Sequence, residues 1–221
     1  MIHTVCMSMR TQAERSEATR RALLDSGRRL FERRGFDAVT AEEIVTEARV
    51  TRGALYHHFA HGKPDLFREV VREVMQEVHG RLAAAGRRAR TPLEALKLGV
   101  GAFLEVCTEP GHRRVLLVDG PAVLGWHAWR AMDLEYGLGL LRRALEAAAR
   151  ARQIRLEDLE TTTHLLAGAL VDGALLLGQA PGEPARRRRI ETTLLRLLAG
   201  LERERRGRPV PAGPGRPASG R

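Results

Sequence analysis

Helical periodicity runs along almost the whole chain of 221 residues and constrains its fold more than any other feature. Apolar residues recur at intervals of three and four, as in Ile190, Leu194, Leu197, Leu198 and Leu201, which is the spacing of one face of an α-helix. Stretches that alternate with a period of two and are rich in Val, Ile and aromatic residues, as strands are, do not occur. We therefore predict an all-α protein.

Composition points to an anionic partner inside the cell. Apolar residues make up 43% of the chain, enough for a core without metal or disulfides, and the net charge of +10 makes nucleic acid the first candidate partner. The charge alone does not prove this partner, because almost all of it is Arg, with Lys63 and Lys97 as the only lysines. Cys6 and Cys107 match no metal or redox spacing, as expected in a reduced cytoplasm.

Neither a secretion signal nor a membrane span is expected. The first ten residues, MIHTVCMSMR, contain no apolar run before a cleavage site. The apolar stretch Leu165–Leu177 is interrupted by Asp172 and is shorter than the roughly 20 residues that a span needs. We expect a cytoplasmic protein that makes no contact with a membrane.

Glycine, proline and capping residues divide the N-terminal part into short helices and one long one. Thr40 and Glu43 form a capping-box pattern, Thr51 can cap the next helix, and Pro64 suits the first turn of a long helix. The predicted helices span about 16–34, 41–48, 52–59 and 64–88. The predicted units are a flexible arm (1–13), a helical head (14–77), a larger helical domain (78–205) and a disordered Gly/Pro/Arg-rich tail (206–221).

The larger domain is predicted to end in a helical hairpin. A helix from Pro92 to about Thr108 is followed by breaks at Pro110-Gly111 and Gly120-Pro121 and by a helix or broken pair over 121–152. Two helices at about 156–179 and 184–204 are joined by the sequence APGEP and are expected to fold back antiparallel. Because this hairpin is apolar around much of its surface, a second copy is expected to cover it, giving a homodimer.

The segment 40–59 has the layout of a helix-turn-helix. A helix of about eight residues, a tight turn and a second short helix with a polar face allow the second helix to enter the DNA major groove. Buried helix pairs in enzymes can have the same spacing, so spacing alone leaves both interpretations open.

Particular residues decide between them. The sequence GFDAVTAEEIVTEARVTRGALYHHFAHGKPDLF, residues 35–67, resembles the DNA-binding signature of the TetR family of transcriptional regulators, and the match extends over about 60 residues. It departs from the family pattern at Arg49, where the family mostly has Gly, and at Val45, where it mostly has Ala. Arg49 must then adopt a left-handed backbone, at a cost on the order of 1 kcal/mol.

The resemblance implies which residues contact DNA. It places Thr40 against a phosphate at the start of the first helix of the motif, and Thr51, Tyr56 and His57 on the recognition helix. Arg52 is the candidate for reading guanine N7 and O6, while Gly53 and Ala54 allow close approach. We expect Lys63 to add its charge to a helix N-terminus that holds a phosphate.

The resemblance also implies a C-terminal domain that dimerises, here through about 156–204, and holds a small-molecule effector. Candidate pocket residues, which ordinary core packing explains as well, are Phe103, Trp126, Trp129, Tyr136 and His164. Asp172 is either a buried hydrogen-bonded group or an interface residue facing a partner Arg. The adjacent charges of Arg186–Arg189 are interpreted as a solvated helix end.

The predicted function is that of a repressor released from a palindromic, double-stranded operator by an unidentified small molecule. No phosphate-binding Gly loop, nucleophile elbow or zinc-type spacing is present, so neither catalytic residues nor a metal or cofactor is expected. A nonspecific, nucleoid-like DNA-binding protein is the alternative, because an Arg-rich chain can bind phosphates without reading bases. A helical adaptor that binds only protein is a third possibility.

Overall fold

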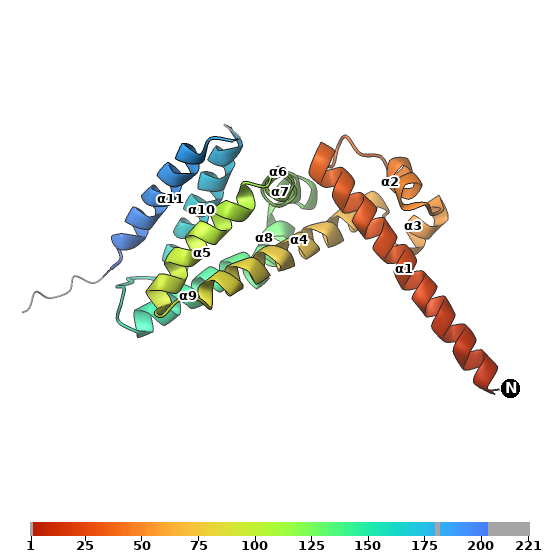
Figure 1. Ribbon diagram of the computed structural model, residues 1–221, viewed down its shortest axis with the longest axis horizontal. Helices are drawn as coiled ribbons and strands as arrows, with labels where there is room; N and C mark the ends of the chain where they lie inside the picture. The colour runs from red at the N-terminus through yellow and green to blue at the C-terminus, as the bar shows by residue number, and fades with distance from the viewer. Residues whose placement is uncertain (1, 180–181, 203–221) are drawn as a thin grey trace, which may run out of the picture.

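The computed structural model describes residues 2–179 and 182–202 (Figure 1). These residues are helical throughout, apart from connecting turns and one isolated antiparallel bridge between Ile154 and Glu202, so the all-α prediction is confirmed. The elements are α1 (Ile2–Arg34), α2 (Ala41–Ala48), α3 (Arg52–His58), α4 (Lys63–Gly86), α5 (Pro92–Cys107), α6 (Pro110–Arg113), the π-helix η1 (Arg114–Asp119), α7 (Gly120–Leu124), α8 (Trp126–Glu135), α9 (Gly137–Arg150), α10 (Leu159–Gly178) and α11 (Pro184–Ala199).

Three aromatic rings form the centre of the head, which consists of α1, α2, α3 and the start of α4. The ring centroid of Phe31 lies 5.1 Å from that of Phe67 and 5.8 Å from that of Phe36, and the Phe36 and Phe67 centroids are 4.9 Å apart. Leu55 and Phe59 of the α3 region are buried in the same core. This core fixes how α3 sits on the head.

The first helix is longer than predicted. α1 begins at Ile2 rather than near Ser16, and so takes in the segment expected to be a flexible arm. Neither Gly nor Pro occurs before Gly27, and residues such as Gln12, Ala13 and Glu14 favour helix, so nothing in the sequence stops the helix from extending toward the N-terminus. The tail over 206–221 lies outside the described residues.

One helix joins the head to the rest of the molecule. α4 runs from the head into the C-terminal body (Figure 1). Its first turns bury Leu66, Phe67 and Val70 in the head core, while its last turns lie along α5. Any displacement of its C-terminal end can therefore be transmitted to the head.

The segment after α5 differs from the prediction. The break predicted at Pro110-Gly111 is present, because α5 ends at Cys107 and α6 begins at Pro110, but the break predicted at Gly120-Pro121 is not, since α6, η1 and α7 follow one another directly. Pro121 is tolerated because it lies in the first turn of α7, directly after the wide π turns, where the amide of Gly120 bonds to the carbonyl of Val115, five residues earlier. At Gly120 a Cβ atom would lie 3.0 Å from Trp129 Cδ1, so glycine allows the indole to pack there.

Polar contacts join the head to this segment. Asp119 accepts a hydrogen bond of 2.8 Å from the backbone N–H of Phe36, and the Arg114 guanidinium donates one of 2.7 Å to the carbonyl of Arg33. They attach the C-terminal end of α1 to η1.

α10 and α11 form the predicted antiparallel hairpin, with α10 beginning at Leu159 and α11 ending at Ala199 (Figure 1). Small residues permit the close approach, because a Cβ atom on Gly173 would lie 2.9 Å from Ile190 Cγ2. Asp172 is exposed, which rules out its interpretation as a buried group.

Among the described residues, one helix matches a membrane span in length and composition. This helix is α10, at 20 residues, which is longer than the apolar stretch Leu165–Leu177 within it. The helix is longer than its apolar core because Asp158 caps it well before Leu165. Only 28% of its apolar window is buried within this chain.

Candidate nucleic-acid interface and effector cavity

A capping box positions α2. The Thr40 hydroxyl accepts a bond of 3.2 Å from the amide of Glu43, and the Glu43 carboxylate accepts one of 2.8 Å from the amide of Thr40. The bond from the Thr40 amide and the bond from Arg34 lower the pKa of Glu43 to about 2. The Thr40 side chain is exposed but already engaged in this cap. Its oxygen therefore sits fixed at the N-terminus of α2, where the resemblance places a phosphate.

The turn between the two helices has the left-handed backbone expected of it. Arg49 has φ 58° and ψ 41°, and its amide bonds to the carbonyls of Thr46 and Val45. Val45 is buried in the head core, so the larger side chain at this position fills space rather than disturbing the motif. Both departures from the family pattern are accommodated within the helix-turn-helix.

Replacing Arg49 by Gly is expected to raise the free energy of unfolding by about 1 kcal/mol, because glycine adopts positive φ without steric cost. Urea denaturation of the purified protein would measure this. Arg49→Ala is the matched control, since it removes the same side chain but keeps the strained backbone, and it should give no gain. Equal stability of the two variants would contradict strain at this position.

α3 presents one face to solvent and one to the core. Thr51 caps the helix by accepting a bond of 3.2 Å from the amide of Ala54. Leu55 is fully buried, whereas Tyr56 is 44% exposed and Arg52 is exposed. The Arg52 guanidinium carbon lies 5.8 Å from the Tyr56 ring centroid, so the two side chains form a cation–π pair on the outer face.

The remaining α3 residues leave this face accessible. Gly53 is exposed, with Thr51 Oγ1 as the only atom near its missing Cβ, and Ala54 is half-buried. His57 is exposed, while its neighbour His58 packs edge-on against it and is half-buried. Burial, followed by the charge of His57, lowers the pKa of His58. No bulky side chain among the described residues therefore prevents a DNA backbone from approaching the start of α3 closely.

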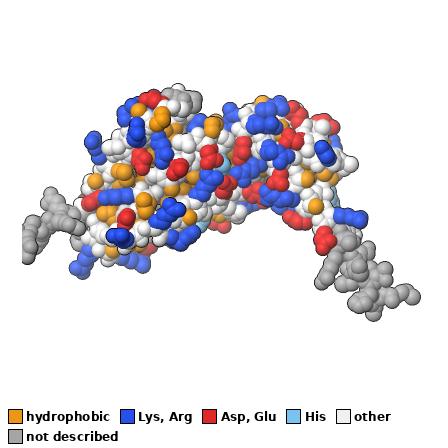
Figure 2. Space-filling model, in the orientation of Figure 1, with side chains coloured by type: hydrophobic (Ala, Val, Ile, Leu, Met, Phe, Trp, Pro, Cys, Tyr) orange, Lys and Arg blue, Asp and Glu red, His pale blue; other side chains and the backbone are white. Residues whose placement is uncertain are grey.

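Most arginines of α1 are already paired with acids. Their ion pairs are Arg20–Glu69, Arg21–Asp25, Arg21–Glu73, Arg28–Glu32, Arg28–Glu77, Arg29–Glu47, Arg33–Glu47 and Arg34–Glu43. Figure 2 shows the resulting mixture of basic and acidic side chains on the face of the head in view. Arg52 makes no ion pair within the described residues, so its charge is available to an external anion.

A shallow hollow beside α3 was not predicted. Residues 12–19 of α1 lie against Ala54, His57 and His58, and the hollow's α1 wall includes Gln12, Arg15 and Ser16. No sequence pattern indicates this hollow, because only the packing of α1 against α3 brings these residues together. The hollow extends the exposed face of α3 onto α1.

Lys63 differs from the prediction. Its ammonium donates to the carbonyls of Phe36 and Val39 at 3.0 and 2.8 Å and lies 3.9 Å from the Phe36 ring centroid. Burial lowers its pKa. In this structure the side chain holds the loop between α1 and α2 instead of reaching outward to a phosphate, because the loop carbonyls lack helical partners there.

Replacing Lys63 by Met is expected to lower the free energy of unfolding by about 2 kcal/mol, since two carbonyls lose a charged donor. Lys97→Met is the control: it breaks a surface ion pair with Glu202 and should cost less than about 1 kcal/mol. Urea denaturation would measure both. A Lys63→Met protein of unchanged stability but weakened DNA binding would instead support the phosphate contact.

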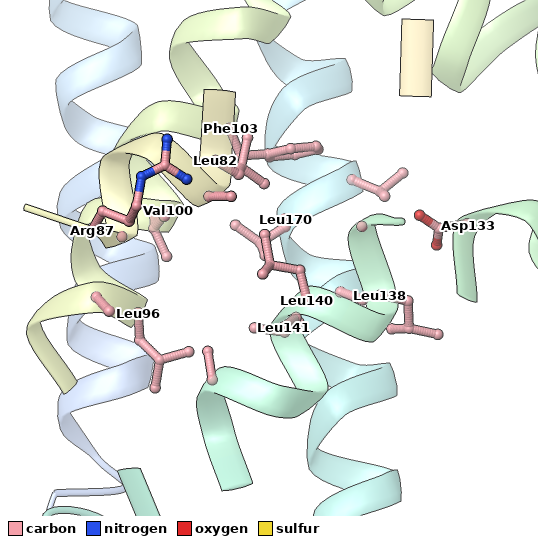
Figure 3. Close-up of a pocket in the computed structure, with 18 residues that line it drawn as sticks. Leu82, Arg87, Leu96, Val100, Phe103, Asp133, Leu138, Leu140, Leu141 and Leu170 are labelled. Carbon is pink, nitrogen blue, oxygen red and sulfur yellow. The ribbon is translucent and has the colours of Figure 1, made fainter. Parts of the chain in front are cut away.

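A cavity of about 380 Å³ lies in the C-terminal body (Figure 3). Apolar side chains and glycines of α4, α5, α9 and α10 form most of its wall, among them Leu82, Leu96, Phe103, Leu141 and Leu170. Its volume and its mostly apolar wall are typical of small-molecule sites.

Of the five predicted pocket residues, only Phe103 lines this cavity. Trp129 is buried in the core and donates to the carbonyl of Leu116 at 2.8 Å, while Trp126 is 58% exposed. The Tyr136 hydroxyl accepts a bond from Gln76, and His164 lies 3.0 Å from Arg130. The four lie outside the cavity wall because α8 places its tryptophans toward η1 and solvent, while α9 supplies leucines to the cavity.

A helix-turn-helix whose second helix is exposed on a compact head, joined by one long helix to a helical body, is the architecture of DNA-binding regulators of transcription. Comparison with known proteins specifies the family. The model of bacterial regulatory proteins of the tetR family matches residues 23–70, and the model of the tetracyclin repressor-like C-terminal domain matches residues 93–201. The chain belongs to the TetR family of transcriptional regulators.

Individual relatives agree. A crystal structure of a TetR-family transcriptional regulator from Pectobacterium atrosepticum has a TM-score of 0.73 and 30% identity, covering 86% of this chain and 96% of that chain. The Transposon Tn10 TetC protein of Escherichia coli is 25% identical over 71% of this chain and 79% of its own length. The HTH-type transcriptional repressor BepR of Brucella suis is 35% identical over 48% of this chain and 51% of its own length.

Proposed function

We propose that this protein is a cytoplasmic repressor that binds a palindromic operator as a homodimer and is released by a small-molecule effector. The observation that carries the proposal is the course of α4. This helix begins five residues after α3 ends, and its C-terminal turns, with Leu82 and Gly86, line the cavity. A molecule in the cavity therefore contacts the same helix that positions the recognition helix.

The proposed DNA-binding residues are those on the exposed side of the motif. Arg52 and Tyr56 reach base edges and phosphates from the outer face of α3, and Thr40, Thr51 and His57 contact the sugar-phosphate backbone. The small residues Gly53 and Ala54 leave room for DNA to approach the start of α3. Two heads related by a two-fold axis would read half-sites one helical turn apart, roughly 34 Å.

The dimer is proposed to form through the α10–α11 hairpin. Leu165, Leu176 and Leu197 are 70%, 39% and 54% exposed, although leucine is ordinarily buried. Gly168 lies on the same face of α10 as Leu165, and the space around its missing Cβ is open. A second copy packed against this face would cover the leucines and bring the two helices close together.

Release is proposed to occur by movement of α4. We expect a molecule that fills the cavity to shift α4 relative to α9, and the α1–η1 contacts through Asp119 and Arg114 to couple a shift of the body to the head. Two heads whose separation has changed no longer fit successive major grooves.

Selection of bound duplexes from a random pool, at fixed salt concentration, tests the proposed function. Enrichment of a palindrome that the protein prefers over random DNA by roughly a thousandfold supports a dimeric operator-binding regulator. Salt-sensitive binding without any enriched sequence would contradict it and indicate a nonspecific DNA-binding protein. Absence of DNA binding would contradict it as well.

A further inference from the structure

Two charged residues lie on opposite sides of an otherwise apolar cavity. Among the residues that line it, only Arg87 and Asp133 carry a charge. Figure 3 shows Arg87 on one side, Asp133 on the other, and leucines including Leu140, Leu141 and Leu170 between them. The cavity thus has one charged residue on each of two opposite sides and apolar side chains between them.

Asp133 lies on the more buried, inner side of the cavity, where its side chain is 20% exposed. Its carboxylate bonds at 3.0 Å to Arg130 and is held at the junction of α8 and α9, where a Cβ atom on Gly137 would lie 2.8 Å from Oδ1. The pKa of Asp133 is raised, because the effect of burial exceeds the opposing effect of the Arg130 charge. A ligand anion here would meet a carboxylate, and a ligand cation would meet Arg130. The inner side therefore favours an uncharged part of a ligand.

Arg87 is placed at the solvent side. It caps the C-terminus of α4 and is exposed, as are Arg88 and Arg90 just after it. Arg87 forms no ion pair within the described part of the chain. Arg87 thus lines the cavity and is exposed as a residue, and an arginine placed in this way can pair with an anionic group at a cavity mouth.

We propose that the effector is a largely apolar molecule with a single anionic head group, whose body fills the cavity and whose head pairs with Arg87. This inference rests on the proposed function, because it names the chemical class of the molecule that would release the operator. Asp133 fixes the orientation by repelling the head from the inner side.

Three probes with the same apolar body test the class: decanoate, decanol and decyltrimethylammonium, each below its aggregation concentration. Calorimetric titration of the full-length protein without DNA gives a dissociation constant for each. Decanoate is expected to bind most tightly and the ammonium most weakly, by roughly tenfold. Equal or tighter binding of the ammonium overturns the proposal, as does failure of all three probes to bind.

Substitutions in the protein test where the anionic head group of the ligand binds. Arg87→Gln should weaken decanoate binding by roughly threefold to fivefold and leave decanol unchanged, because the ion pair is partly exposed. Arg88→Gln removes the same charge from a neighbouring residue that does not line the cavity, and should change neither. Asp133→Asn should leave decanoate binding unchanged or stronger. If Asp133→Asn weakens decanoate binding, or if both arginine variants weaken it equally, the proposed orientation is wrong.

A separate readout distinguishes this proposal from the proposed function. Release of the selected operator by each probe is measured by fluorescence anisotropy of labelled DNA. Binding of decanoate through Arg87 without operator release would support the ligand class and contradict the release mechanism. Operator release by decyltrimethylammonium, with no decanoate binding, would support the release mechanism and overturn the ligand class.

Discussion

Replacing Arg52 and Tyr56 together by alanine is expected to weaken binding to the selected operator by about a thousandfold or more. Each half-site loses a guanine contact worth roughly 1 to 3 kcal/mol and the contacts of an exposed aromatic side chain, and the dimer loses both sets twice. Both residues lie on the outer face of α3, opposite buried Leu55, so the fold should be unaffected. Fluorescence anisotropy with labelled operator and random duplexes measures the loss.

Two controls separate base reading from charge. Arg52→Lys retains the charge but not the bidentate geometry, and should lose preference for the operator while keeping its affinity for random DNA. Arg150→Ala removes an equivalent charge from α9, where the side chain is 78% exposed, and should leave operator binding intact. A double variant that still prefers the operator would show that α3 is not the recognition helix.

Substituting Leu165 and Leu197 by glutamate is expected to raise the dissociation constant of the dimer by roughly a hundredfold or more. Burying an unpaired carboxylate against a partner costs several kcal/mol, about 3 kcal/mol or more in total, and the two-fold axis doubles the number of charges. Because both leucines are exposed in the single chain, the substitutions should not unfold it. Sedimentation velocity over a range of concentrations would measure the shift to monomer.

The matched control is Leu134→Glu. This residue is 46% exposed on α8, outside the hairpin, and the same substitution there should leave the dimer intact. The hairpin variant should also lose operator affinity, because a single head reads only one half-site. Persistence of the dimer in the Leu165/Leu197 variant would mean that another surface joins the two copies.

The helix-turn-helix could be predicted almost residue by residue. α2 occupies the predicted span, Thr40 and Glu43 form the predicted cap, and Arg49 adopts the predicted left-handed backbone. These features depend on interactions within about four residues, namely a capping hydroxyl, an i to i+3 amide bond and a steric limit on φ. Leu55 and Phe59 are four residues apart and therefore share the buried side of α3.

Features that depend on distant residues were predicted poorly. Lys63 has a basic side chain near a helix start, which favours a phosphate contact, yet carbonyls more than twenty residues away engage it. Four of the five aromatic and histidine candidates lie outside the cavity wall, since residue type says nothing about which side of a helix faces a void. Gly120-Pro121 predicted a break in the helix, but the π-helical turns of η1 continue directly into α7 at this position.

By itself the sequence determined the helical class, the motif and the capping of its helices, because these follow from local periodicity and short-range hydrogen bonds. Only the tertiary structure decided that α4 joins the cavity to the head, that Asp119 and Arg114 attach η1 to α1, and that Arg87 and Asp133 share one cavity. Those relations require residues far apart in the chain to meet. Which distant residues meet depends on how the helices pack, and that packing is determined jointly by many side chains.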